Sequence, residues 1–431
     1  MKVYEKVYNF YVNQIENKSL LPGDRMPSLR ESEKTLNVSR TSIETAYLQL
    51  AADGYIYSVE KVGYFISETA GRFFEQATAK GGVKAKSAPK YKYDLATIGE
   101  DKTVSCLELW RRYMKSALRQ EDRLLNYPSS QGEEDLRREI AAHVRKTRNI
   151  ICSMDDIVIG AGFQNLLQIL IALIPGEKTI SFPTRNFSDG AMTFKNAGFQ
   201  VNYRDKNSHV IYVTPSYMTK WGEVMTMKRR HELIDHSLKN NHLIIEDDYQ
   251  NDFVFSTKPT PSLYAMTGGE NIAFLGSFSR VLLPSVRISF LILPKGTREE
   301  YENIKAYYNQ TASIAEQIAL AQFLRDGHLN RHIKKMKKLY DEKRNIMKSN
   351  LEQLFKETAK VFMGESGMEM ALWLSNKYDL SKVKNNVVKI EYIHGANTDS
   401  MLLLSCSRID KMVIPRAIQE LHFCLQKAFV A

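Results

Sequence analysis

The chain has 431 residues, 43% of them hydrophobic, which is enough for two or more domains with sizeable cores. Its net charge is +11, but residues 1–67 hold eight basic and eight acidic side chains, so this segment would contact DNA through a few placed cations. The four cysteines are scattered without metal-ligand spacing, which excludes a disulfide framework and favours a reduced, cytoplasmic protein. The sequence has no apolar run near ~20 residues and no signal-peptide pattern, which excludes a membrane-spanning chain.

The first 67 residues predict three helices and two short strands. Residues 3–17 form the first helix, with an apolar stripe of Val7, Phe10, Tyr11 and Ile15. Residues 28–31, Ser-Leu-Arg-Glu, are a capping box that opens a second helix ending near residue 36. Ser39 is expected to cap a third helix with an inward face of Ile43, Ala46, Tyr47 and Leu50. Strands at 55–59 and 64–67 then complete a helix-turn-helix with a wing.

The string PGDRMPSLRESEKTLNVSRTSIETAYLQLAADGYI closely resembles the DNA-binding domain of GntR-family transcription regulators, and the resemblance covers residues 1–67. It implies that the DNA-binding residues are Arg25, Ser28 and Arg30 at phosphates, Ser39, Arg40, Thr41 and Ser42 at the amino end of the third helix, which enters the major groove, and Lys61 and Gly63 at the wing tip. The alternative is a small helical module for protein contact.

Residues 68–92 contain two adjacent glycines, five lysines and one arginine, with no apolar periodicity. This composition predicts a flexible basic linker, solvated or in loose contact with DNA phosphates. A second basic run, on a helix expected at residues 327–354, is either a solvated face or a further DNA contact.

From residue 93 onward, β-rich runs alternate with helices over more than 300 residues, which predicts an α/β fold with a mainly parallel sheet covered on both faces. We expect a large part at about 93–310 and a small α/β part at about 311–431.

Residues 275–294, LGSFSRVLLPSVRISFLILP, place a Ser-Phe-Ser-Arg turn after an apolar strand, where open α/β sheets bind ligands. The segment resembles the turn of fold-type I pyridoxal phosphate (PLP) enzymes and their regulator relatives, in which a lysine forms the Schiff base. Arg280 stands in the place of that lysine. A guanidinium stays protonated, so Arg280 can bind an anion but cannot attack an aldehyde.

The same resemblance implies the other cofactor-binding residues. Gly162, Phe163 and Gln164 follow a strand in a glycine-containing turn suited to a phosphate. Arg185 stands where the family stacks a tyrosine on the cofactor ring, Asp247 would pair with the pyridine nitrogen and Tyr249 would donate to the ring oxygen. Ser277, Ser279 and Arg287 keep the positions of phosphate ligands. Lys220 is either a relocated amine or an exposed loop lysine.

Together the two segments resemble the MocR (GabR-like) subfamily of GntR regulators, a winged helix-turn-helix joined to an aminotransferase-like domain, which implies a homodimer on double-stranded DNA. The first hypothesis is a transcription regulator that senses a small-molecule effector without catalysis, with PLP bound non-covalently, or with Arg280 and Arg185 serving another anion or filling the pocket. The second is a PLP-dependent aminotransferase with an appended DNA-binding domain. A third is a large domain that serves only for dimerisation.

Overall fold

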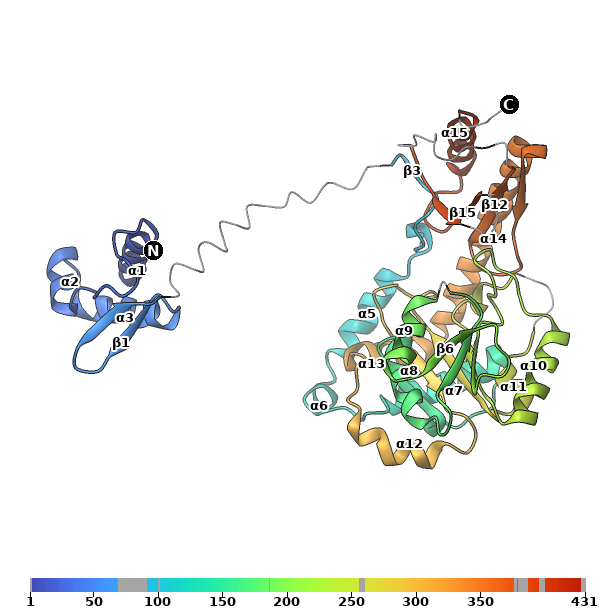
Figure 1. Cartoon of the computed structure of the whole chain (residues 1–431), viewed down its shortest axis with the longest axis horizontal. Helices are drawn as coiled ribbons and strands as arrows, with labels where there is room; N and C mark the ends of the chain where they lie inside the picture. Colours follow the sequence, from blue (N-terminus) through green and yellow to red (C-terminus); the bar gives the residue numbers. More distant parts are fainter. Residues whose placement is uncertain are drawn as a thin grey trace. The chain divides into compact units, whose positions relative to one another are not determined.

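The computed structural model describes residues 2–68, 91–99, 101–185, 187–255, 260–375, 378, 387–394 and 400–427. The chain divides into an N-terminal unit, Met1–Lys90, and a C-terminal unit, Tyr91–Ala431 (Figure 1). Most of the linker predicted at 68–92 lies outside the described residues.

The N-terminal unit contains the predicted winged helix-turn-helix. Its elements are α1 (Val3–Glu16), α2 (Leu29–Leu36), α3 (Arg40–Ala52), β1 (Ile56–Val59) and β2 (Gly63–Ile66). The two strands pair in antiparallel fashion, with Ile56 opposite Ile66. The predicted inward positions of α3 are all fully buried. Of the predicted stripe of α1, Val7, Tyr11 and Ile15 are buried, whereas Phe10 is 40% exposed and packs edge-on against the Tyr11 ring.

The C-terminal unit is built on a sheet that, in the described residues, has seven strands in the order β4-β10-β9-β8-β7-β5-β6. These strands are β4 (Ile157–Gly160), β5 (Thr179–Phe182), β6 (Gln200–Tyr203), β7 (Val210–Val213), β8 (Leu243–Asp247), β9 (Ile272–Ser277) and β10 (Ser289–Ile292). Neighbours from β9 to β6 run parallel, and β10 is antiparallel to both β4 and β9. The predicted α/β class with a mainly parallel sheet is therefore confirmed.

Helices cover both faces of this sheet. Successive residues of one strand, such as Ile244 and Ile245, belong to two different apolar clusters because side chains alternate between the faces. One cluster includes side chains of α8 (Phe163–Leu173), α9 (Ser188–Asn196) and α12 (Arg298–Ile304). The other includes α5 (Leu107–Ala117), α7 (Glu134–Arg148), α10 (Met227–Asn240), α11 (Leu263–Thr267), α13 (Ile314–Arg325) and α14 (His328–Phe355). The short helix α6 (Glu121–Leu124) precedes α7.

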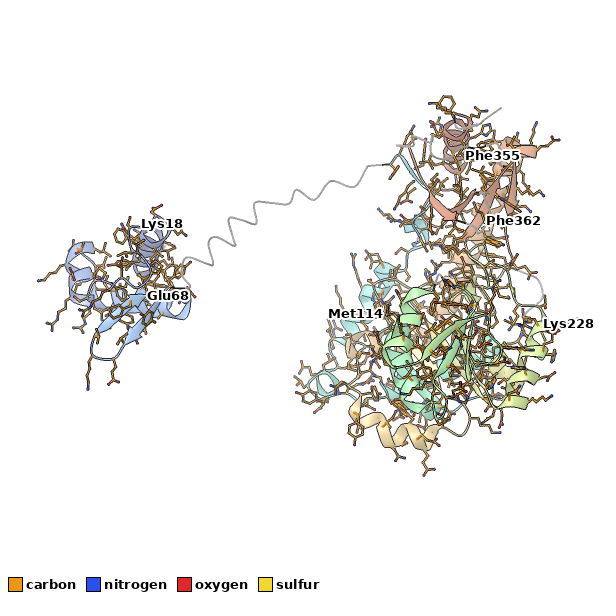
Figure 2. All side chains as sticks on the ribbon, viewed as in Figure 1. Lys18, Glu68, Met114, Lys228, Phe355 and Phe362 are labelled. Carbon is orange, nitrogen blue, oxygen red and sulfur yellow. The ribbon has the colours of Figure 1, made fainter. Side chains whose placement is uncertain are left out.

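The small part of this unit is a second sheet in the order β11-β12-β15-β14, with all its pairs antiparallel. Its strands are β11 (Ala359–Phe362), β12 (Glu369–Leu374), β14 (Glu391–His394) and β15 (Ser400–Ser405), followed by α15 (Ile414–Gln426). The separate strands β3 (Tyr93–Asp94) and β13 (Val388–Lys389) pair in parallel. The ring of Phe355, labelled in Figure 2, meets His422 of α15 edge-on at 4.8 Å and so joins α14 to α15.

Two features of this fold bear on function. The carboxyl ends of β8 and β9, at Asp247 and Ser277, meet at one edge of the large sheet, where open α/β sheets place their ligands. Across the described ranges, no helix combines the length and apolar character needed to span a membrane.

Candidate functional site

The outer face of α3 carries the side chains predicted to read DNA bases. Arg40 and Thr41 are exposed in its first turn, and Ser42 is half-buried. Arg40 Nε lies 3.0 Å from Glu44 Oε1, with 56% and 44% of the two side chains exposed. A surface pair of this kind contributes only ~0–1 kcal/mol, so Arg40 can exchange Glu44 for a guanine edge at little cost.

The residues at the starts of α2 and α3 differ in what they do. Ser28 accepts a hydrogen bond from the Glu31 amide at 3.2 Å and completes the predicted capping box, and Arg30 is exposed beside it. Ser39 is the N-cap residue of α3 as predicted, but its hydroxyl makes no cap bond and pairs instead with the Ser42 hydroxyl at 3.0 Å. Ser39 stays exposed at the amino end of α3.

The wing brings three of the predicted residues together. Arg25 donates to the carbonyl of Val62 in the turn between β1 and β2. Gly63 has a φ of +131°, and a Cβ there would stand 3.5 Å from Arg25 Nε. Lys61, with a φ of +63°, is exposed at the tip of this turn. Arg25 therefore supports the wing turn that presents Lys61.

A cavity of about 430 Å³ lies in the C-terminal unit, where β8 and β9 end and α8 begins. Its walls include seven of the ten predicted cofactor-binding residues, namely Phe163, Asp247, Tyr249, Ser277, Ser279, Arg280 and Arg287. Phe187, Ser289 and Met368 also line it and were not predicted.

One end of the cavity is suited to an anion. Gly162, at a φ of +92°, is the N-cap of α8, whose first backbone N–H groups have no partner within the helix. A Cβ on Gly162 would stand only 2.8 Å from Arg287 Nη2, so glycine is what lets the guanidinium reach this helix end. Arg287 has no ion-pair partner among the described side chains. Ser289 donates to Ser277 Oγ at 3.1 Å on the same wall.

A second end presents a buried carboxylate. Asp247 is 7% exposed, and burial raises its pKa to about 7, with Asp248 adding to the rise and a hydrogen bond from the Tyr212 hydroxyl opposing it. Among the described residues, no basic side chain pairs with Asp247, so its charge would be stabilised by a cationic N–H of a ligand. Tyr249 lines the same cavity, and burial raises the pKa of its hydroxyl.

Arg280 also lines the cavity, and neighbouring side chains hold its guanidinium in place. Its Nη2 lies 3.5 Å from Oε1 of Glu369, the first residue of β12 in the small part. The Gln250 carboxamide turns its oxygen toward Arg280, and this oxygen accepts a hydrogen bond from Arg280 Nε at 3.1 Å. Glu369 also accepts from the Tyr217 hydroxyl at 3.0 Å. Neither Glu369 nor Gln250 was predicted as a partner of Arg280, because these contacts depend on tertiary packing.

Arg185, which stands where the family stacks a tyrosine on the cofactor ring, does not line the cavity. Arg185 is exposed and its guanidinium lies 5.4 Å from the centroid of the Tyr203 ring, away from the cavity lining. The aromatic side chain in the wall is Phe187, whose ring stacks on Tyr212 at 4.7 Å. A Cβ on Gly190 would overlap the Phe187 ring, so that glycine makes room for it.

Two further predicted residues lie away from the cavity wall. Gln164 is exposed in the first turn of α8 and is not part of the lining. Lys220 pairs with Glu391 of β14 at 2.9 Å, and 41% and 42% of these side chains are exposed. In the part of the chain that the structure describes, the cavity lining contains no lysine.

Behind Asp247 lies an ion cluster that sequence reasoning missed. Asp248 points away from the cavity to Arg148 at 2.5 Å, and Arg148 also contacts Asp252 at 2.9 Å. Burial opposes ionisation of Asp252, but the charge of Arg148 lowers its pKa overall. Alternation of side chains along β8 was the available signal, since it separates Asp247 from Asp248.

Both units match known families. Residues 3–66 match the family described as bacterial regulatory proteins, gntR family, and residues 99–398 match aminotransferase class I and II. No metal-binding group of three acidic, histidine or cysteine side chains is found in the described ranges.

Whole-chain relatives carry names of transcriptional regulators. The chain is 34% identical over 394 residues to the uncharacterized HTH-type transcriptional regulator YhdI of Bacillus subtilis (strain 168), covering 86% of this chain and 83% of that one. It is 25% identical to the HTH-type pyridoxine biosynthesis transcriptional regulator PdxR of Corynebacterium glutamicum, covering 93% and 91%. It is 23% identical to the probable rhizopine catabolism regulatory protein MocR of Rhizobium meliloti, covering 85% and 81%.

Solved structures show the same fold in enzymes. An archaeal alanine:glyoxylate aminotransferase superposes with a TM-score of 0.68 at 20% identity, covering 89% of this chain and 99% of that one. A kynurenine aminotransferase of Pyrococcus horikoshii superposes with a TM-score of 0.67 at 20% identity, covering 87% and 98%. At this identity the likeness establishes the fold alone.

Proposed function

The chain belongs to the MocR-type HTH transcriptional regulators, in which a gntR-family DNA-binding domain is followed by an aminotransferase class I and II domain, and from this premise we propose that its cavity binds PLP reversibly as a signal and does not transform it. The observation that carries the proposal is Arg280, a permanently charged side chain in the cavity wall, tied to Glu369 and Gln250.

The residues around the cavity fit PLP. Arg287 and the amino end of α8 would hold the phosphate, since both favour an anion and Gly162 leaves room for them to converge. Asp247 would accept the pyridine N–H, which supplies the positive charge its burial otherwise lacks. Phe187 offers a ring face in the wall, in the role first expected of Arg185.

When bound, PLP supplies an aldehyde and an electron-withdrawing ring, and a transaminase needs a nearby amine to exploit them. Arg280 cannot lose the proton that such an amine must lose. Lys220, the possible relocated amine, pairs with Glu391 instead. These features support a binding role and argue against the alternative of an aminotransferase with an appended DNA-binding domain.

On the DNA side, we propose that residues 1–67 bind an operator, that 68–92 act as the linker and that 93–431 form the effector-binding and dimerisation part of a cytoplasmic protein. Arg40, Thr41 and Ser42 would read bases, and Arg25, Ser28 and Arg30 would hold phosphates. Lys61 and Gly63 would form the wing tip near the minor groove. As the family resemblance implies, this part would hold two copies of the chain together as a homodimer. A dimer reads paired half-sites at a set spacing.

The ligand can regulate only if it binds better to one of two conformations, so its effect on operator binding equals its differential affinity. The test is to titrate the full chain with PLP and follow tryptophan fluorescence and operator gel shifts. We expect saturable quenching that dialysis reverses, and a change in operator affinity at the same concentrations. No change in either fluorescence or operator affinity would leave a domain that serves only for dimerisation.

A further inference from the structure

We propose that Arg280, fixed by Glu369, makes the cavity select the aldehyde form of the cofactor and reject its aminomethyl form, pyridoxamine phosphate. This inference rests on the proposed binding of PLP and concerns the part of the same cavity that Arg280 lines. It assigns to Arg280 a role in ligand discrimination rather than in phosphate binding.

The first step is the direction in which Arg280 can donate. Its Nε and Nη2 are engaged by Gln250 and Glu369. Nη1 has no hydrogen-bond partner among the described residues, although the side chain is only 20% exposed and lines the cavity. Nη1 is thus left as a donor for an acceptor on a ligand in the cavity.

The second step is that Glu369 cannot serve a ligand ammonium group. Its side chain is 1% exposed and lies outside the cavity lining. One of its oxygens faces Arg280, and the other accepts from the Tyr217 hydroxyl and the Met368 amide, each at 3.0 Å. A ligand at this end therefore meets N–H donors and no free carboxylate.

The third step is the sign of the field that the pair projects into the cavity. Burial is the main cause that raises the pKa of the Tyr249 hydroxyl; among its charged neighbours Asp247 raises it, Arg280 lowers it and Glu369 raises it, in decreasing order. Arg280 and Glu369 thus act on Tyr249 in opposite directions, and of these two side chains it is Arg280 that lines the cavity.

The fourth step is the orientation of the ligand. With an anion at Arg287 and a ring N–H at Asp247, the ring oxygen would face Tyr249, and the aldehyde or aminomethyl substituent would face Arg280, which stands in the place of the Schiff-base lysine. An aldehyde oxygen accepts from Nη1, whereas an ammonium group brings a second positive charge to a guanidinium. Juxtaposed like charges are an effective way to exclude a competing ligand.

The experiment compares the dissociation constants of PLP and pyridoxamine phosphate for the full chain by calorimetry. We expect PLP to bind at least about tenfold more tightly, and Arg280→Gln to bring the two constants within about threefold of each other. Arg185→Gln is the matched control, since it removes the same charge from an exposed arginine outside the cavity. It should leave the ratio unchanged.

Equal affinities in the native chain, or an unchanged ratio in Arg280→Gln, would overturn this inference while leaving the proposed function intact. Binding of neither compound would instead remove the proposed function. Should Arg280→Gln fail to fold by circular dichroism, Glu369→Gln provides the second test. Loss of the counter-charge should widen the preference for PLP, and a narrowed or unaltered preference refutes the selection.

Discussion

At the scale of single residues, the difference between Arg280 and a lysine separates binding from chemistry. A lysine amine in this wall would condense with an aldehyde and release water, whereas a guanidinium can only donate hydrogen bonds. The exchange is visible in the sequence. Its partners Glu369 and Gln250 are not, because they lie 89 and 30 residues away and meet Arg280 only through the fold.

Replacing Arg280 by lysine should restore a covalent link to PLP, because Asp247, Arg287 and the α8 end already fit the rest of the cofactor. We expect Arg280→Lys with PLP to develop a yellow absorbance band that borohydride reduces and fixes to the new amine. The native chain is the control. If no colour appears although PLP still binds, the wall holds the aldehyde out of reach of that position.

The burial of Asp247 should lower the free energy of unfolding of the ligand-free protein at neutral pH and above. Its pKa is about 7 in the fold, through burial, against ~3.9 when unfolded, so the native state holds a proton that the unfolded state releases between these values. The stability contributed by this group is present below ~pH 4 and is lost as pH rises to about 7.

Asp247→Asn removes this pH dependence and keeps an acceptor for Tyr212. In urea unfolding at pH 8 the free energy of unfolding of the variant should exceed that of the native chain by an amount on the order of 2–4 kcal/mol. This difference should shrink toward pH 4. Its PLP affinity should fall at least about tenfold, as expected for loss of a charged hydrogen bond. A variant less stable than the native chain at pH 8 would contradict this account.

Arg40 should carry base recognition. Arg40→Ala is expected to lower specific operator affinity by ~1–3 kcal/mol with little change in binding to random DNA, because a bidentate guanine contact is lost. Arg30→Ala is the comparison, since loss of a phosphate contact weakens both equally. Gel shifts with operator and scrambled duplexes distinguish the two, and a uniform loss in Arg40→Ala would remove α3 from the recognition account.

At the scale of elements, the start of α8 shows what a sequence pattern can and cannot predict. The glycine turn after β4 predicted a phosphate-binding helix end, and Gly162 has the positive φ such a turn needs. Counting residues from Pro183 pointed to Arg185, but the side chain that lines the cavity is Phe187, with its ring packed over Gly190. Offsets within a turn depend on turn shape, which composition does not reveal.

Gly162→Ala should destroy the anion end of the cavity, since its methyl would crowd Arg287 Nη2 at 2.8 Å. Gly198→Ala is a matched control with a similar φ, +85°, and nothing within 4 Å of the added Cβ. Both should cost ~1–2 kcal/mol of stability from backbone strain. We expect only Gly162→Ala to weaken PLP binding, by at least about tenfold in calorimetry; equal loss in both would assign the effect to strain.

At the scale of the whole molecule, regulation requires that the cavity and the DNA-binding unit share one equilibrium. Linkage then makes the effect reciprocal, so PLP must change operator affinity by the factor by which the operator changes PLP affinity, typically about 5–150-fold. Paired titrations of the full chain, each ligand with and without the other, measure both factors. Two factors of one would show that the cavity does not regulate DNA binding.

The central claim is that this scaffold holds a small molecule and leaves it unchanged. It is tested most directly by the intact mass of the native chain after incubation with PLP and an amino donor followed by borohydride reduction. The account predicts an unmodified mass with no consumption of the donor. A chain heavier by one reduced cofactor, together with turnover of the donor, would contradict it.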